Sequence, residues 1–344
     1  MEAEQAEKLG KALGHAEEKS THKIYPMQRE EADEYFSAEE DEVQCRENGG
    51  ARRKEGGLEL LNDCKRLFQD DKLFQALRAE RALAEVDPAL HAKHSAYLAM
   101  IRSAGEEVKE ACKGMEGDEG WTLIHKPSHP GDCQIWYRPE ANSAIHSLRV
   151  SADMEASLEY LLVLLNEVEL YSRWLPFIGG SKTLLRTARC ALYAWVKVNS
   201  PAALLINHRD TCIHVKAIDA LDEEGRVLLI VRNHHAGLAA LSSDFNNDYH
   251  GMLSAGGEQD SCPKVECPEG GVRTVRMEIK HAALSLYPLA NGGTRVVAVG
   301  LVDPKLDVMP AWLINMIAHK VCWVGMWQWN RHARQVSLAL KACY

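Results

Sequence analysis

The stretch from residue 303 to residue 334 constrains the fold more than any other part of the chain. It opens with the turn signal Asp303-Pro304, and Pro310 then stands where the first turn of a helix tolerates proline. No proline follows, so the sequence predicts a helix over 310–334. Apolar residues occupy nearly every side of this helix. Such a helix is either buried on two sides, or covers a cavity with one side and meets an apolar environment with the other.

The large side chains of this helix fall on one face. A helical wheel places together Trp312, Met316, Trp323 and Trp327, with His319 and Met326 at the edge. The opposite face holds Ile314, Ile317, Val321 and Val324. A membrane span is disfavoured because Asn315, His319 and Lys320 would be costly in hydrocarbon. The helix is therefore either an ordinary core helix or the wall of a binding cavity.

Composition excludes several classes of function. The net charge of -9 argues against binding to nucleic acid. The ten cysteines are scattered and the first residues are acidic and polar, so we expect a cytoplasmic protein with reduced thiols. Cys262 and Cys267 do not supply the four ligands of a zinc site, and we expect no metal. No nucleophile motif or phosphate-binding loop is present, so we expect no catalytic residue and no cofactor.

The first third of the chain divides in two. Residues 1–56 are charged and carry few large apolar side chains, so disorder is expected. Residues 57–115 show helical periodicity in two or three antiparallel helices, with Asp87-Pro88 between them. Around Phe74 this segment resembles a tetratricopeptide-type hairpin. One hairpin is not an array of repeats, so the segment is expected to be accessory to the main domain. Binding of a protein partner through residues 58–113 is an alternative that the sequence leaves open.

After a glycine-rich linker at 114–120 the apolar period becomes two, which marks residues 116–344 as one domain. Strands are predicted at 121–126, 133–138, 145–151, 181–188, 190–198, 211–220, 226–235, 272–286 and 294–302, and a helix at 154–171. Asn291-Gly292-Gly293 predicts a hairpin between the last two strands. A curved antiparallel sheet with a long helix laid across it encloses a volume. The fold class is therefore α+β.

The order of these pieces resembles START lipid-transfer domains. The resemblance rests on the run from Val299 to Asn315, on Ile206 to Asp210, on Asp222 to Arg226, on Gly120-Trp121 and on Tyr171 to Trp174. It spans about residues 121–334. It implies a helix-grip fold, a curved antiparallel sheet wrapped around the C-terminal helix, that holds one membrane lipid for transfer or sensing.

The resemblance also implies where the lipid contacts lie. Trp195 falls at one position of the aromatic cage of choline-lipid members, whereas the cage tyrosines and the charged position of sterol-type members do not carry over. Strand alternation suggests that Ile213 and Val215 line the cavity while His214 points away. The pair Arg209-Asp210 is expected to be an ion pair at a strand start. The candidate lipid-binding residues are Tyr171, Trp174, Trp195, Arg209, Ile213, Val215, Arg232, Trp312, Met316, Trp323 and Trp327.

Carrying a lipid makes a physical demand on the fold. Moving an acyl chain of about sixteen carbons into water costs on the order of ten kcal/mol, so a carrier must enclose the chain and still open. The C-terminal helix is the natural gate, and Trp323, Trp327 and Trp329 suit transient contact with a membrane surface. We expect no enzymatic activity. Two alternatives stay open, a cyclase, hydratase or hydrolase that uses the same cavity, and a scaffold.

Overall fold

The computed structural model describes residues 48–129, 132–140, 145–200, 206–233, 268, 271, 273–306 and 311–343, without the side chains of 48–55, 311–318 and 339–343. The chain divides into two compact units, with one boundary between residues 108 and 109. One unit holds the N-terminal helices, and the other holds the sheet and the C-terminal helix. Within the described residues, no helix is both long and apolar enough to cross a membrane.

The N-terminal unit consists of α3 (Asn48–Gln69), α4 (Leu73–Val86), α5 (Pro88–Lys93) and most of α6 (Ser95–Ala111). Asp87 begins α5 by accepting a hydrogen bond from the Leu90 amide at 3.0 Å, as an N-cap side chain does. The buried Glu80 of α4 binds His91 of α5 and Arg102 of α6, which ties three helices together. Helix α3 begins at residue 48, inside the segment 1–56 for which the sequence predicts disorder; residues 1–47 lie outside the described residues.

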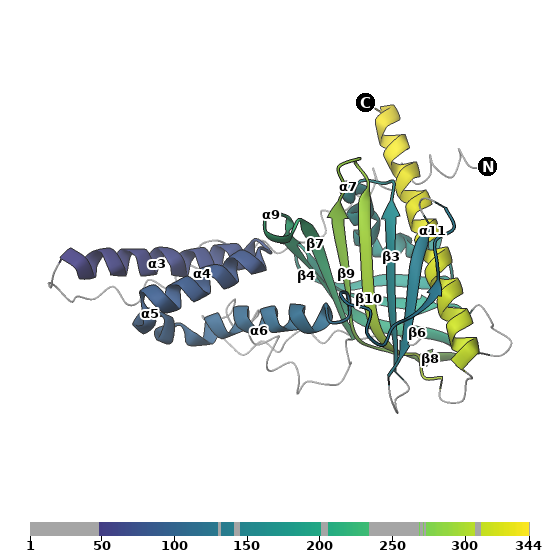
Figure 1. Ribbon diagram of the computed structural model, residues 1–344, viewed down its shortest axis with the longest axis horizontal. Helices are drawn as coiled ribbons and strands as arrows, with labels where there is room; N and C mark the ends of the chain where they lie inside the picture. The colour runs from purple at the N-terminus through teal and green to yellow at the C-terminus, as the bar shows by residue number, and fades with distance from the viewer. Residues whose placement is uncertain are drawn as a thin grey trace. The chain divides into compact units, whose positions relative to one another are not determined.

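The described strands of the second unit form one curved sheet (Figure 1). In chain order they are β1 (Thr122–His125), β2 (Cys133–Pro139), β3 (His146–Met154), β4 (Ile178–Ala188), β5 (Ala191–Val198), β6 (His208–Ala220), β7 (Arg226–Asn233), β8 (Thr274–Arg276), β9 (Glu278–Pro288) and β10 (Thr294–Asp303). They pair antiparallel in the order β1-β2-β3-β10-β9-β7-β6-β5-β4, and β8 joins β6 in parallel. The predicted strands and the hairpin between β9 and β10 are thereby confirmed, except that the strand predicted over 272–286 is divided at Met277 into β8 and β9, which pair with different strands. Residues 234, 235 and 272 of the predicted strands lie outside the described residues.

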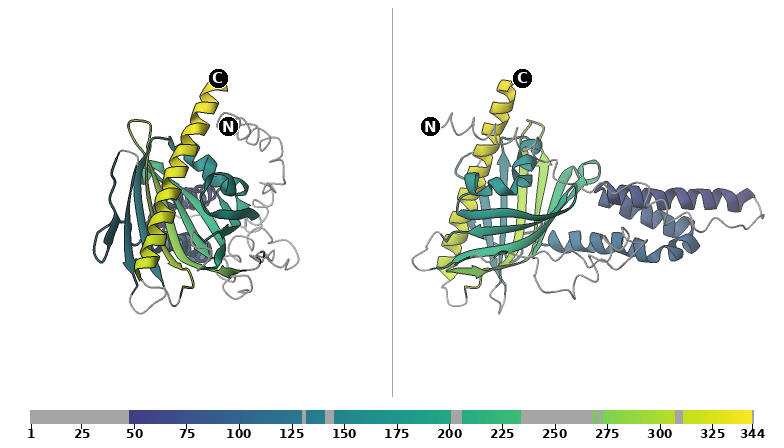
Figure 2. Two further views of the ribbon diagram at one scale, coloured as in Figure 1. Left: turned by 90° about the vertical axis from the view of Figure 1, so that its right-hand side faces the viewer. Right: turned by 180° about the vertical axis from the view of Figure 1, so that it is seen from behind.

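Helices cover one face of this sheet, which we call the inner face. It carries Val215, Ala217, Val227, Leu229, Leu284, Leu286 and Val296, which all belong to or pack against one apolar cluster. The covering helices are α7 (Leu158–Asn166), the 3-10 turn η2 (Val168–Leu170), α8 (Tyr171–Trp174) and α11 (Ala311–Cys343). Figure 2 shows α11 crossing the sheet on that side. The predicted α+β class, a curved antiparallel sheet around a long C-terminal helix, is confirmed.

Two helix boundaries differ from the sequence prediction. The helix predicted over 154–171 begins at Leu158 and ends at Asn166, because Met154 is still a strand residue paired with Thr294. The chain then continues through η2 and α8 rather than as one helix. The C-terminal helix predicted to end at Arg334 continues to Cys343, since no proline or glycine interrupts it after that point.

The outer face of the sheet is covered in part by the linker that follows α6. Arg149 of β3 is 4% exposed, and its guanidinium lies over the rings of Trp121 and Trp136, 5.1 Å and 4.3 Å from their centroids. The same guanidinium pairs with Asp118 at 2.5 Å. Stacking of arginine on aromatic rings is attractive, so this arrangement fixes the linker on the sheet.

The packing of α7 gives a first test of the fold. Leu161 is fully buried, whereas Val163 on the same helix is 40% exposed. We expect Leu161→Ala to lower the free energy of unfolding by about 2–5 kcal/mol, through lost burial and the cavity left behind. Val163→Ala, the matched control, should change it by no more than about 0.5 kcal/mol. Urea denaturation measures both, and equal losses would contradict the placement of α7.

Candidate functional site

The middle of the inner face carries apolar side chains that the covering helices do not fully bury. On β6 these are Ile213, Val215 and Ala217, and on β7 and β9 they are Val231, Ala282 and Leu284. The register brings them together, because Val215 pairs with Val231, and Val231 pairs with Ala282. Apolar side chains that point toward covering helices and remain half-buried favour an apolar binding surface.

One end of this surface is covered by η2 and α8. Val168, Leu192 and Ala194 form a buried cluster there, and Tyr171, Ile213 and Val215 pack against it. The Tyr171 hydroxyl donates to the Leu165 carbonyl at 2.5 Å, and burial raises the pKa of this tyrosine well above its usual range. The structure thus gathers Tyr171, Ile213 and Val215, three of the residues that the sequence nominates as lipid contacts.

Four buried polar atoms in this region have no hydrogen-bond partner among the described residues: Trp174 Nε1, Ser181 Oγ, Thr183 Oγ1 and Trp329 Nε1. Trp174 and Trp329 are only 3% and 5% exposed. Ser181 and Thr183 pair with Val196 and Ala194 of β5, so they lie on the inner face. A buried donor without a partner costs about 1–3 kcal/mol. An acceptor brought next to these atoms would therefore be stabilising.

Helix α11 presents a different face to the protein than the wheel predicts. Its inward stripe consists of Cys322, Met326, Trp329, Ala333 and Val336, all of which belong to or pack against the inner clusters. Trp323 and Trp327 are 37% and 45% exposed. Trp329, which the sequence places at the membrane boundary, is buried instead. The side chains of Trp312 and Met316 lie outside the described residues.

The part of α11 from His319 to Trp323 is held to the sheet by a group that we call the polar latch, formed by His125, Asp132, His319 and Trp323. His319 Nε2 lies 3.0 Å from His125 Nδ1, and His125 Nε2 lies 3.2 Å from Asp132 Oδ1. Trp323 Nε1 donates to the same Asp132 oxygen at 2.9 Å. Sequence reasoning missed the latch because His125 and His319 stand 194 positions apart.

Asp132 is held as a carboxylate. Burial alone would raise its pKa, but the amides of Ser128 and Cys133 and the ring of His125 lower it far below the usual range. His125, Asp132 and Cys133 bring possible metal-ligand atoms within 4.8 Å of one another. Both Asp132 oxygens already accept N–H donors, and burial raises the pKa of the Cys133 thiol to about 12. The arrangement therefore fits a hydrogen-bonded cluster better than a metal site.

Arg209 anchors the turn that leads into α11. Its guanidinium donates to the carbonyls of Pro304 at 2.5 Å and Lys305 at 3.1 Å, and to that of Asn207 at 2.7 Å. The turn is further fixed by Lys305, which pairs with Asp303 at 2.6 Å and Glu278 at 2.9 Å. Arg209 is thus engaged by backbone carbonyls just before α11.

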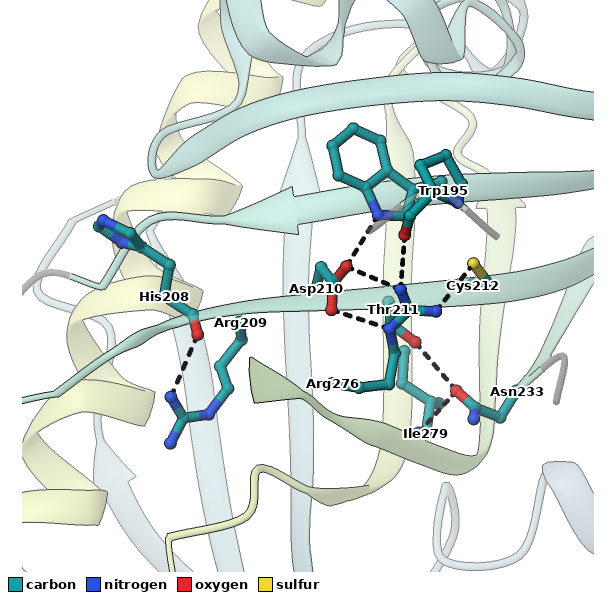
Figure 3. A network of polar contacts seen from close by, with 10 residues as sticks. Trp195, His208, Arg209, Asp210, Thr211, Cys212, Asn233, Arg276 and Ile279 are labelled. Carbon is teal, nitrogen blue, oxygen red and sulfur yellow. Dashed lines mark hydrogen bonds and ion pairs between the residues drawn. The ribbon is translucent and has the colours of Figure 1, made fainter. Parts of the chain in front are cut away.

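The predicted ion pair between Arg209 and Asp210 is wrong, because Asp210 pairs with Arg276 of β8 (Figure 3). Two arginine nitrogens lie 2.8 Å and 2.9 Å from the Asp210 oxygens, and Trp195 Nε1 donates to Asp210 at 2.9 Å. Asp210 is 2% exposed. Strand alternation places this cluster on the outer face, away from Ile213 and Val215. Trp195 and Arg232, both nominated as lipid contacts, lie on that outer face.

One cysteine departs from the expected redox state. Cys212, which follows in the same strand and receives a hydrogen bond from Arg276 at 3.2 Å, is disulfide-bonded. Among the described residues, Cys64, Cys112, Cys133 and Cys322 carry free thiols. The expectation of reduced thiols throughout the chain is therefore wrong at Cys212. Cys262, Cys267 and His234 lie outside the described residues.

Comparison with known proteins bears on the fold alone. Neither protein-family models nor curated proteins match the sequence. Among solved structures, human StAR-related lipid transfer protein 5 matches over 69% of this chain and 98% of its own, with 13% identity and a TM-score of 0.53. The chain has the helix-grip fold of StAR-related lipid-transfer domains.

Two further solved structures of this kind also match. Human STARD10 is 14% identical over 67% of this chain and 80% of its own, with a TM-score of 0.49. A STAR-related lipid transfer protein fragment from Xanthomonas axonopodis is 17% identical over 63% of this chain and 99% of its own, with a TM-score of 0.44. The resemblance that the sequence motifs indicate is confirmed at the level of fold.

The polar latch predicts a local effect on α11. We expect Asp132→Ala to speed amide hydrogen exchange over residues 319–326 by roughly tenfold, because the Trp323 and His125 contacts lose their acceptor. Residues 329–336, packed in the apolar cluster, should keep their rates. Asp153→Ala, which removes an exposed pair with Arg295, serves as the control. Unchanged exchange over 319–326 in the Asp132 variant would show that the latch does not hold the helix.

Burial also sets the response to acid. It lowers the pKa values of His146, His281, His319 and His332 in the folded state. In the unfolded chain these histidines have the ordinary pKa of about 6.5. As the pH falls below that value, the unfolded chain binds protons before the folded chain does, so the folded state becomes less stable. We expect the urea midpoint to be lower at pH 5.5 than at pH 7.5, and the difference to shrink in His319→Gln. A urea midpoint that is higher at pH 5.5 than at pH 7.5 would contradict the lowered pKa values of these histidines.

Proposed function

We propose that the chain binds one hydrophobic ligand, a membrane lipid, against the inner face and transfers or senses it, with α11 as the gate and without covalent chemistry. The observation that carries this is the row of half-buried apolar side chains on β6, β7 and β9 under the helices. A sheet face lined this way is favourable for a hydrocarbon chain, at roughly 25 cal/mol for each Å² removed from water.

The two attachments of α11 support its role as a gate. Around Cys322 and Met326 it rests on β2 and β3, and there the polar latch provides the specific contacts. When this part opens, water can replace the hydrogen bonds of the latch, so the net cost of losing each is only about 0.5–1.5 kcal/mol. Around Trp329, Ala333 and Val336 the helix is buried in the larger apolar cluster. We infer that the first part moves while the second stays in place.

The outward side of α11 supports contact with a membrane. Trp323 and Trp327 are exposed neighbours on this helix, and Arg331 lies 5.5 Å from the Trp327 ring centroid. Tryptophan is enriched where an apolar phase meets water, and arginine attracts anionic headgroups. The proposal therefore includes a transient membrane contact through this side of the helix.

Native mass spectrometry of the full chain tests the ligand. After incubation with vesicles of mixed lipids, we expect a one-to-one adduct whose extra mass corresponds to a lipid. A bare protein mass after the same incubation would overturn the proposal, since it would mean that the inner face is filled without a ligand.

The membrane contact is tested by charge substitution. We expect Trp327→Asp to slow lipid transfer between vesicles at least tenfold, because a carboxylate does not enter the membrane interface. Leu221→Asp is the matched control: Leu221 is similarly exposed, at 40%, but lies on the short helix α9 (Leu221–Glu224). Equal transfer rates in the Trp327 variant and the wild type would rule out this surface of the gate.

A further inference from the structure

The identity of the lipid can be narrowed from the unpartnered donors, on the assumption that the proposed function holds. Trp174 of α8 and Trp329 of α11 belong to one apolar cluster, and the two helices contact each other. Their indole nitrogens are buried and have no partner among the described residues. A buried tryptophan N–H usually finds an acceptor. Two such N–H groups on adjoining elements of the inner face are therefore a place where a bound ligand would gain by supplying an acceptor.

The chemistry of the missing partner follows from the donors. An indole N–H can only donate, so its partner must be an acceptor such as a carbonyl, ether or hydroxyl oxygen. Ser181 Oγ and Thr183 Oγ1 lie on the inner face of β4 and are unpartnered as well. Strand β4 contacts α8, so the hydroxyls stand on an element that adjoins Trp174.

Charge restricts the ligand further. Among the described residues, the arginines at the borders of the inner face are already engaged: Arg209 by the carbonyls of Pro304 and Lys305, and Arg186 by Asn166. Asn233 and Thr211, also on the inner face, are neutral and bonded to each other at 2.9 Å. A buried phosphate or ammonium needs a partner of opposite charge, and no described residue offers an unengaged one at the centre of the inner face.

We propose that the ligand is an uncharged lipid that presents an oxygen acceptor to the indole N–H groups of Trp174 and Trp329. The hydroxyls of Ser181 and Thr183 provide further hydrogen bonds on the β4 side. Fatty acids and phospholipids whose charged group would enter this region are disfavoured, whereas lipids with ester, amide or alcohol groups fit it.

A matched pair of probes tests the proposal on the full chain. Diacylglycerol and phosphatidic acid with the same acyl chains differ only by the phosphate, and each is offered in phosphatidylcholine vesicles. By native mass spectrometry we expect the diacylglycerol adduct to exceed the phosphatidic acid adduct at least tenfold. Equal or preferential uptake of phosphatidic acid would overturn the uncharged-lipid assignment. Absence of every lipid adduct would instead overturn the proposed function itself.

The donors are tested by removing the N–H and keeping a ring. Trp174→Phe and Trp329→Phe should each weaken diacylglycerol uptake about tenfold, whereas Trp136→Phe, on the outer face beside Arg149, should not. Because either variant could also disturb packing, indole NMR of the wild-type chain provides a second measurement. Addition of diacylglycerol should shift the Trp174 and Trp329 N–H signals and leave that of Trp136 in place. Unmoved signals with bound lipid would refute the contact.

Discussion

The burial of one stripe of α11 is the interaction on which the second unit depends. Met326, Trp329 and Val336 are apolar residues of this stripe that contact the inner clusters, and burying each large apolar side chain is worth about 1.5–3 kcal/mol. Their sum is a sizeable fraction of the 5–15 kcal/mol that usually separates folded from unfolded protein. The sheet curves because of its size and twist, but its inner face stays out of water only while α11 lies across it.

The contacts that hold α11 to the sheet are polar near its beginning and apolar farther along. Before the helix, the turn at Asp303–Lys305 is fixed by Arg209 and by the ion pairs of Lys305, and hydrogen bonds to Lys280 and Lys305 lower the pKa of Glu278 to about 2. The polar latch comes next, and the apolar cluster follows from Trp329 onward. Polar contacts exchange with water at small net cost, whereas apolar contacts do not. The contacts of the first half of α11 therefore cost less to break than those of its second half.

The strands and the long helix could be predicted because their signals are local. Alternation of apolar residues locates β5, β6 and β10, and Asn291 to Gly293 locates the hairpin. The inward face of α11 could not be predicted from residue size. The wheel favours Trp323 and Trp327, but the stripe in contact with the protein includes the small residues Cys322 and Ala333. Small side chains let a helix approach a sheet closely, and that distance is a property of the tertiary structure.

The polar contacts of the second unit could not be predicted from the sequence for a related reason. The pairing of Asp210 with Arg276 and the contact between His125 and His319 join residues far apart in the chain. Their spacing therefore leaves no periodic signal. Adjacent charges such as Arg209 and Asp210 suggest a pair, but successive residues of a strand point to opposite faces. Accordingly, Arg209 lies at the border of the inner face, and Asp210 lies in the polar cluster on the outer face.

Under the proposed function, the same side chains that contact the ligand also affect the stability of the fold. Half-buried apolar side chains on β6 and β9 and indole N–H groups without acceptors both raise the free energy of the ligand-free chain. A ligand that binds only the folded state stabilises it by mass action, by about 2.7 kcal/mol at a hundredfold excess over Kd. Under the proposed function, the groups that contact the lipid would therefore also link its binding to the packing of α11 against the sheet. Transfer and sensing would then both follow from one equilibrium between the lipid-bound chain and a lipid-free chain whose helix packs less firmly.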